Sequence, residues 1–265
     1  MPILEIQGLT RRFGDVYAVD HLQLAVEPGE MFALLGPNGA GKSTTIKMLT
    51  TLLPPSEGAA RVAGRDVVRE AAEVRRLIGY VPQMLSADGT LTGFENLLIF
   101  ARMYELPRRE RAERVREALS FMGLADSADR LVRQYSGGMI RRLEIAQSML
   151  HDPRVLFLDE PTVGLDPAAR RAVWDHIQSL RQRRGMTIIL TTHQMEEADL
   201  LCDRVAIMHK GRRVALGTPA GLKATIGTPR ATLDDVFIHY TGANLDSGGT
   251  YRETRTTRRS ARRLG

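Results

Sequence analysis

Residues 36–43, with the sequence GPNGAGKS, match the phosphate-loop pattern GxxxxGK[ST] in full. They follow an apolar run at 31–35 and precede a helix-like run. Glycines at this spacing let the backbone curl so that successive N–H groups point inward at phosphate oxygens, and a helix N-terminus adds the positive end of its dipole. The segment therefore predicts a site for the phosphates of a nucleoside triphosphate.

Two side chains of this loop have specific expected roles. Lys42 can reach the β- and γ-phosphates, and the hydroxyl of Ser43 can ligate the Mg²⁺ that bridges them. An ordinary Gly-rich turn would not explain the complete pattern in its strand-then-helix context. The expected nucleotide-binding residues of the loop are Gly36, Pro37, Asn38, Gly39, Ala40, Gly41, Lys42, Ser43 and Thr44.

Two adjacent carboxylates, Asp159 and Glu160, end the apolar run VLFLDE at 155–160. A buried parallel strand delivers such residues to the carboxyl edge of its sheet. Because side chains alternate along a strand, Asp159 can serve the Mg²⁺ shell while Glu160 faces an attacking water as general base. Alone, this triplet would be weak evidence, but beside a complete phosphate loop it predicts the second half of a hydrolytic site.

A second phosphate-friendly helix start lies at Ser136, Gly137 and Gly138, where a helix is predicted over 137–150. A capping serine followed by two glycines exposes backbone N–H groups at the start of that helix. The chain already has one phosphate site, so the second suggests service to a nucleotide held by another copy. An ordinary serine N-cap is the alternative for these residues alone.

The hydrophobic pattern alternates between strands and helices. Thr92 and Glu95 form a capping box that opens one helix, and Pro107 closes it. The pattern predicts an α/β fold with a parallel sheet covered on both faces and interrupted by a helical insert at about 89–154. The expected strands are 3–8, 21–35, 60–63, 78–82, 155–160 and 187–192, and the expected helices are 42–52, 94–106, 137–150 and one beginning at Pro167.

Composition excludes several classes of protein. No apolar run approaches the roughly 20 residues that cross a bilayer, and the first ten residues lack the features of a signal peptide. Cys202 is the only cysteine, which excludes an internal disulfide, fits a reducing compartment and predicts a small buried helix residue. Any membrane role is therefore expected to come through a partner.

The net charge of +6 is concentrated at the C-terminus. Residues 245–265 hold six arginines against Asp246 and Glu253, so the rest of the chain is only weakly basic and no specific nucleic-acid binding is expected. Low apolar content predicts that 244–265 form a disordered basic tail. Attraction to an anionic membrane surface and a simply solvated terminus are both open for this tail.

Taken in their order along the chain, these motifs make residues 3–240 resemble the ATP-binding subunit of an ABC transporter. The resemblance implies a P-loop NTPase core with a parallel sheet, an N-terminal antiparallel β subdomain and an inserted α-helical subdomain. It implies one ATP-binding domain at 1–243, with the insert at about 89–154 and a short C-terminal extension at about 218–243.

The resemblance also assigns roles that the residues alone do not reveal. Gln83 would be the Q-loop glutamine that binds ATP and Mg²⁺, His193 the catalytic switch histidine, and Asp166 a residue of the dimer interface. Phe13 sits where the family stacks an aromatic ring on adenine. The five-residue signature motif is YSGGM at 135–139, and its first and last residues, Tyr135 and Met139, depart from LSGGQ. Ser136, Gly137, Gly138 and Met139 would contact the nucleotide of the partner chain.

The family mechanism implies two ATP molecules sandwiched in a head-to-tail homodimer or pseudo-dimer, with Glu160, His193 and Lys42 catalytic. A separate membrane-spanning permease subunit would use the hydrolysis, which places the chain at the cytoplasmic face of a membrane. The segment 47–67, the YSGGM signature and the ending TLDDVFIHYTG resemble daunorubicin/doxorubicin exporters in particular. The preference for arginine over lysine hints at a GC-rich bacterial genome.

Two alternatives remain open at this point. Soluble ABC ATPases that act on ribosomes or DNA usually carry two cassettes or a long coiled coil, whereas this chain has one motif set and no long heptad run. Importer ATPases usually carry a larger C-terminal regulatory domain than the stretch after Gly217, although shorter ones exist.

Overall fold

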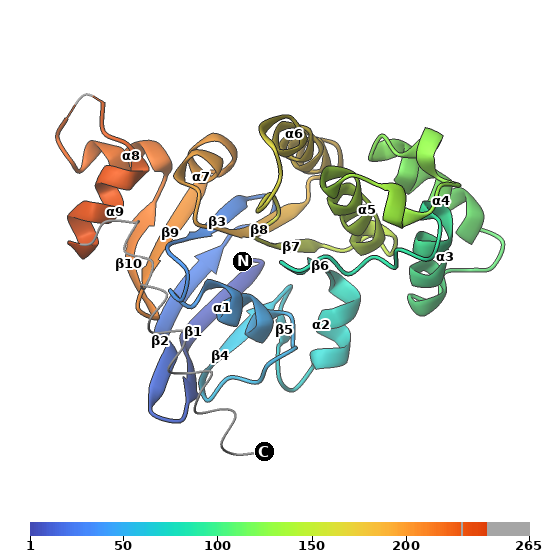
Figure 1. Cartoon of the computed structure of the whole chain (residues 1–265). Coiled ribbons are helices and arrows are strands. Elements are labelled where there is room, and N and C mark those ends of the chain that lie inside the picture. Colours follow the sequence, from blue (N-terminus) through green and yellow to red (C-terminus); the bar gives the residue numbers. More distant parts are fainter. Residues whose placement is uncertain (229, 243–265) are drawn as a thin grey trace, which may run out of the picture.

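Two β-sheets carry the loops that hold the predicted site (Figure 1). The computed structural model describes residues 1–228 and 230–242. The larger sheet is parallel except for its edge strand β10, which runs antiparallel to β9. In spatial order its strands are β10 (Arg212–Gly217), β9 (Arg204–His209), β3 (Met31–Leu35), β8 (Thr187–Thr192), β7 (Val155–Asp159) and β6 (Ile78–Val81).

The smaller sheet is antiparallel and lies against one side of the larger sheet (Figure 1). In spatial order its strands are β2 (Val16–Val26), β1 (Leu4–Phe13), β4 (Glu57–Val62) and β5 (Arg65–Asp66). The helices α1 (Lys42–Leu49) and α2 (Ala71–Leu77) lie on the same side. The fold is therefore α/β, with a mostly parallel sheet and a separate antiparallel sheet, as expected from the sequence.

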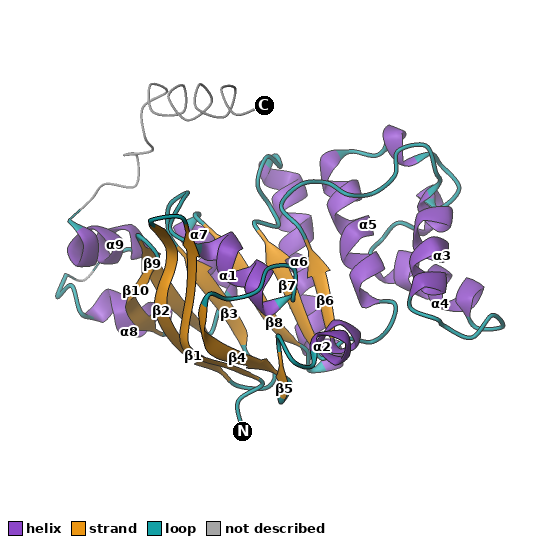
Figure 2. Cartoon of the chain, turned by 90° about the horizontal axis from the view of Figure 1, so that it is seen from below, coloured by secondary structure: helices purple, strands orange, loops and turns teal. Residues whose placement is uncertain are grey.

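The remaining helices cover the opposite face and the two ends of the large sheet. Figure 1 shows α5 (Gly137–Met149), α6 (Pro167–Arg184) and α7 (Met195–Leu201) over that face. Figure 2 shows α3 (Gly93–Met103) and α4 (Arg111–Phe121) beside α5 at one end, and α8 (Pro219–Ala224) and α9 (Leu233–Thr241) at the other. Two short 3₁₀ helices, Ala125–Ser127 and Val132–Gln134, connect α4 to α5.

Strand β3 shows why the large sheet needs cover on both faces. All five of its residues are buried. Met31, Ala33 and Leu35 pack into the core beneath α5, α6 and α7, whereas Phe32 and Leu34 pack into the core shared with α1 and the small sheet. A strand buried on both sides reads as a continuous apolar run, which is why the sequence predicted it without alternation.

The structure corrects the strand expected at 21–35. That stretch forms β2 and β3, which belong to different sheets. The chain turns between them at Pro28 and at Gly29, whose φ is 76°, a left-handed value that suits glycine. The expected strand at 3–8 extends to Phe13, the strand expected at 60–63 spans Glu57–Val62, and helix α2 has no counterpart among the predicted elements.

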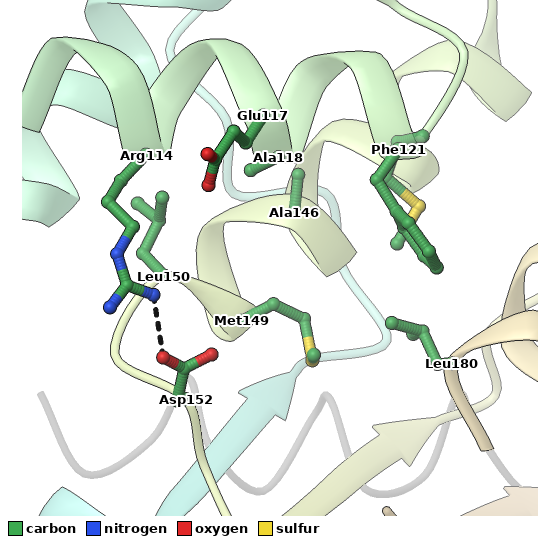
Figure 3. Close-up of a pocket in the computed structure, with 10 residues that line it drawn as sticks. Arg114, Glu117, Ala118, Phe121, Ala146, Met149, Leu150, Asp152 and Leu180 are labelled. Atoms are coloured by element: carbon green, nitrogen blue, oxygen red, sulfur yellow. Dashed lines mark hydrogen bonds and ion pairs between the residues drawn. The ribbon is translucent and has the colours of Figure 1, made fainter. Parts of the chain in front are cut away.

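A small pocket lies where α4, α5 and α6 meet (Figure 3). Seven of its ten lining residues are apolar, with Phe121, Met149 and Leu180 among them, and an ion pair of 2.6 Å joins Arg114 to Asp152. It shares no lining residue with the pocket at the phosphate loop. We regard it as a packing gap between the helices at 93–149 and α6.

Three other observations bear on the sequence predictions. Cys202 is buried as expected, although it follows α7 instead of lying within it, and burial raises the pKa of its thiol. No helix in the described part of the chain is both long and apolar enough to cross a bilayer. The predicted basic tail at 244–265 lies outside the described residues.

Candidate functional site

The phosphate loop connects β3 to α1 and packs tightly against neighbouring strands. A Cβ atom at Gly41, where φ is 101°, would overlap the carbonyl oxygen of Ala18 in β2. A Cβ atom at Gly36 would likewise overlap the carbonyl oxygen of Met208 in β9. Both glycines are therefore required by close backbone approach, and both sheets fix the course of the loop.

The start of α1 is open for an anion. Its N-cap residue, Gly41, makes no side-chain capping hydrogen bond, whereas α3, α5 and α6 are capped by Thr92, Ser136 and Asp166. Backbone N–H groups in the first turn of α1 can therefore donate to a phosphate. A surface pocket lies at this helix end, lined by Ala18, Asn38, Gly39, Ala40, Gly41, Lys42, Ser43, Thr44, Gln83 and Glu160.

Lys42 is a buried cation at the base of this pocket. Its ammonium donates to the carbonyl oxygens of Gly36 at 2.7 Å and Pro37 at 3.2 Å, and lies 3.1 Å from Oε1 of Glu160. An ammonium has three N–H donors, so these three partners satisfy it. A phosphate oxygen that binds Lys42 must therefore replace one of them.

Asp159 lies beside the first turn of α1, as the sequence predicted for a carboxylate that ends a parallel strand. Ser43 donates its hydroxyl to Oδ1 of Asp159 at 2.8 Å, and Thr191 of β8 donates to the same oxygen at 2.5 Å. The described residues contain no group of three or more His, Cys, Asp and Glu side chains that could hold a metal ion. One hydroxyl and one carboxylate suit Mg²⁺, which keeps waters and takes phosphate oxygens as ligands.

Glu160 takes a different direction from Asp159 because the chain bends sharply between them. Its φ is 50°, a left-handed value that is uncommon for glutamate, and its N–H donates to the side-chain and backbone oxygens of Thr191 at 2.9 and 3.1 Å. The buried carboxylate contacts Lys42 through Oε1 and Nδ1 of His193 at 2.8 Å through Oε2. Because a carboxylate only accepts, Nδ1 of His193 carries the proton.

The predicted signature segment caps α5. The hydroxyl of Ser136 accepts from the N–H of Met139 at 3.3 Å, and Ser136 and Gly137 are exposed. A Cβ atom at Gly138 would lie 2.8 Å from Cβ of Ala169 in α6, so this glycine allows the two helices to approach. Among the described residues that line the phosphate-loop pocket, none comes from 136–139.

Comparison with known proteins identifies the family. The family model described as ABC transporter matches residues 19–163, which is more than half of the chain. The chain belongs to the ABC transporter family. It is an ATPase subunit of the kind that binds ATP and hydrolyses it, and its P-loop NTPase fold is the fold that the sequence predicted.

Curated relatives of this ABC ATPase come from drug-resistance and export systems. It is 47% identical over 239 residues to the daunorubicin resistance ATP-binding protein DrrA3 of Streptomyces coeruleorubidus. This match covers 90% of this chain and 74% of the relative. It is 44% identical over 217 residues to the Nod factor export ATP-binding protein I of Cupriavidus metallidurans, covering 82% and 71%.

Two solved structures resemble the ABC ATPase over most of their length. One is an ATP-binding subunit of an ABC transporter, with a TM-score of 0.79 at 31% identity, covering 90% of this chain and 99% of that chain. The other is a dimeric ATP-binding cassette in a post-hydrolysis state bound to ADP and Pi, with a TM-score of 0.71 at 26% identity, covering 81% and 98%.

The remaining predicted site residues of this ABC ATPase lie around the pocket or on other surfaces. Gln83 is exposed and lines the pocket. Phe13 is half exposed at the end of β1, with the guanidinium of Arg11 4.7 Å from its ring centre. Asp166 is exposed and caps α6 by accepting from the N–H of Ala169 at 2.9 Å.

The structure adds residues that the sequence prediction missed. Thr191 contacts both Asp159 and Glu160, and Ala18 lines the pocket from β2. The pair of threonines before His193 was a signal for Thr191, because hydroxyls at the carboxyl edge of a sheet can reach a neighbouring strand end. Tyr135, which departs from the common signature, is buried and donates its hydroxyl to the carbonyl oxygen of Ser127 at 2.6 Å.

Proposed function

We propose that this ABC ATPase hydrolyses MgATP in composite sites formed by two chains and powers export through a separate membrane subunit. The observation that carries the proposal is the convergence of Lys42, Asp159, Glu160 and His193 on the open end of α1. These groups come from α1, β7 and the end of β8. Together they supply a cation, a metal-binding oxygen and an oriented acid–base pair at one phosphate site.

Glu160 acts as the general base in this proposal. When ATP binds, a phosphate oxygen replaces one of the three present partners of Lys42. If the partner replaced is Glu160, its carboxylate becomes free to face the attacking water. His193 keeps its Nδ1–H on Glu160, which leaves Nε2 as an acceptor for an O–H of the attacking water. Lys42 then stabilises charge on the phosphates during transfer.

Mg²⁺ fits the oxygen groups present here. Ser43 and Asp159 would hold it, with Gln83 at the pocket wall as a further oxygen donor. When bound, the ion would neutralise charge on the β- and γ-phosphates. The phosphate loop, residues 36–44, would bind the triphosphate through its N–H groups, and Phe13 would stack on the adenine ring.

A partner chain supplies the second wall of each site in this proposal. The start of α5 carries the signature residues, none of which lines the pocket of its own chain. Ser136 and Gly137 are exposed, Met139 is partly exposed, and Gly138 is buried against α6. A head-to-tail pair would bring this helix end to the partner's γ-phosphate. Asp166 would lie at the same interface. The solved ATP-binding cassette bound to ADP and Pi is dimeric, which supports a dimer here as well.

In this proposal the exported molecule binds the membrane subunit and not the ATPase. Similarity to a daunorubicin resistance protein favours a drug-like molecule, and similarity to a Nod factor export protein makes another exported molecule the second candidate. We place the chain at the cytoplasmic face of a bacterial membrane. Daunorubicin accumulation in cells that express the chain with its permease distinguishes the two, because only drug export lowers it.

Two substitutions test the hydrolytic assignment on the purified chain. Glu160→Gln should lower phosphate release by roughly 10²- to 10⁴-fold, because the base is lost while its shape stays. ATP binding should persist in that variant. Lys42→Ala should instead weaken ATP binding itself, because a charge-assisted contact is removed. Wild-type turnover by Glu160→Gln, or unchanged ATP affinity of Lys42→Ala, would refute the assignment.

A further inference from the structure

Arg141 is a buried guanidinium that joins α5 to the segment around Gln83. It lies between the first and second turns of α5, and only 2% of its side chain is exposed. Its Nη1 donates to the carbonyl oxygen of Pro82 at 2.6 Å, and its Nη2 donates to the carbonyl oxygen of Gln83 at 2.8 Å. The planar fork of arginine is suited to hold two neighbouring carbonyls in one orientation.

Glu144 extends the same link one helical turn further. Its Oε2 pairs with Nη1 of Arg141 at 3.0 Å. Its Oε1 accepts from the Ser86 hydroxyl at 3.1 Å and also from the N–H of Ser86. Only 2% of its side chain is exposed. The two charges therefore fasten both ends of the segment 82–86 to one face of α5.

A contribution to folding stability is a weak explanation for this buried ion pair. Desolvation of two charges offsets much of their attraction, and apolar residues of similar volume often replace such pairs without loss. Burial raises the pKa of Glu144 and lowers that of Arg141, which is the direction expected when both charged forms lose water. The pair does, however, fix geometry, because each charge also holds backbone groups of the segment 82–86.

The two fastened elements carry residues from different ATP sites. Gln83 lines the pocket of its own chain, whereas Ser136 caps the exposed start of α5. Under the proposed function, on which this inference rests, Ser136 contacts the partner's ATP. A displacement of Gln83 in one pocket would then move the helix end that completes the other.

We propose that Arg141 and Glu144 are positioning residues that make the segment 82–86 and helix α5 move as one rigid unit, and thereby couple the two ATP sites of a dimer. Neither residue lines the phosphate-loop pocket. Their action depends on the two hydrogen-bonded carbonyls, the ion pair and the Ser86 contacts. No other side chain of α5, a helix that the structure describes in full, hydrogen-bonds to the segment 82–86. Arg142 serves a different link, because its Nη1 donates to the carbonyl oxygen of Met122 at the end of α4 at 2.8 Å.

Distances within one chain test this unit directly. Spin labels at Met84→Cys and Gln134→Cys, both exposed positions, report on the segment 82–86 and on the residues just before α5. Cys202 is replaced by alanine, and labelled chains are diluted into unlabelled ones so that only distances within a chain are measured. Spectra are recorded with and without Mg²⁺ and a nonhydrolysable ATP analogue.

The background chain, which carries only Cys202→Ala and the two labels, should give one narrow distribution of distances between the labels. Nucleotide should not shift that distribution. In Arg141→Met/Glu144→Met, which leaves no buried charge unpaired, nucleotide should broaden or shift it. Glu144→Gln keeps an acceptor for Ser86 and should give a smaller broadening, which preserves the test if the double variant folds poorly. The control Arg142→Met removes a charged contact from the same helix and should behave as the background chain.

Hydrolysis supplies a second readout. The double variant should lose about 2- to 30-fold in turnover, the range expected for altered coupling, while the affinity for ATP stays the same. A nucleotide-induced shift in the background chain, or an unshifted narrow distance in the double variant, would overturn the proposal. Because the label distances lie within one chain, they remain decisive even if α5 serves no partner.

Discussion

At the scale of single residues, a buried carboxylate outside the pocket connects the elements that hold the reactive groups. Glu197 of α7 accepts at Oε1 from Thr162 and from Trp174, both at 2.8 Å, and is 1% exposed. Thr162 follows Glu160, and α7 follows His193. Glu197 therefore ties α7, which begins two residues after His193, to α6 and to the segment that follows Glu160.

Glu197 should make stability depend on pH. Burial raises its pKa in the folded chain above the unfolded value of about 4.5, despite its hydrogen bonds. The folded state then holds the proton more tightly, so this contribution to stability is complete below the unfolded pKa and is lost as pH rises through the folded pKa. Glu197→Gln cannot titrate.

The difference in unfolding free energy between Glu197→Gln and the wild type should therefore shift in favour of the variant as pH rises from 4.5 to 8. Urea denaturation at several pH values measures it, and subtracting the two curves removes the titrations that both chains share. A difference that stays constant with pH would show that the carboxylate has the same pKa in both states.

Residue chemistry at the site could be predicted where a local pattern carries it. Lys42, Ser43, Asp159 and Glu160 lie in short motifs, and the structure places them together. Arg141, Glu144 and Glu197 could not be found this way, because charged residues on a helix usually face water. Only the packing of distant segments makes them buried.

At the scale of elements, substitutions at two glycines of the phosphate loop distinguish the effect of backbone strain from the effect of close packing. Gly39 and Gly41 both have left-handed φ values, 81° and 101°. A Cβ atom at Gly39 would meet nothing within 4 Å, whereas one at Gly41 would overlap the carbonyl oxygen of Ala18. Substitution by alanine therefore introduces backbone strain at Gly39, but both backbone strain and a steric overlap at Gly41.

Gly39→Ala should cost about 1–2 kcal/mol in unfolding free energy from strain alone. Gly41→Ala should cost more, and should also lose ATP affinity, because the start of α1 must move away from β2. Denaturant titration and equilibrium nucleotide binding measure the two effects. Equal losses for both variants would contradict the role assigned to the contact with Ala18.

Elements were predictable where periodicity and punctuation agree. The capping box of Thr92 and Glu95 starts α3, and the apolar runs mark β3, β7 and β8. The split between β2 and β3 was missed although Pro28 and Gly29 mark it, because both flanking runs have strand character. Sheet order follows from long-range strand pairing, which no local pattern reveals. The family resemblance implied the separate antiparallel β subdomain and the helical insert, but not the order of the strands.

At the scale of the whole molecule, α3 presents apolar side chains to solvent. Ile99 and Met103 lie four residues apart on one face of α3 and are 41% and 70% exposed. Met84 and Leu85 are also exposed, in the segment that follows β6. We propose that the segment 83–94 and the helices after it dock a cytoplasmic helix of the membrane subunit.

Ile99→Glu/Met103→Glu should reduce retention of the chain in membranes that contain the permease, by placing charge in the apolar contact. Leu52→Glu, an exposed apolar position just after α1, is the control and should not reduce retention. Washing at high salt removes attraction through the basic tail but not an apolar contact. Retention without the permease gene, or full retention of the double variant, would contradict this docking surface.

In the proposed dimer, one chain's phosphate loop and the other chain's signature helix together form each ATP site. Mixing Ser136→Ala chains with Lys42→Ala chains tests it most directly, because a mixed dimer contains one site with an intact loop and an intact signature. Phosphate release by the mixture should exceed that of either variant alone, up to about half the wild-type rate per dimer if the sites act independently. No recovery despite confirmed mixed dimers would show that Ser136 serves only as a helix cap.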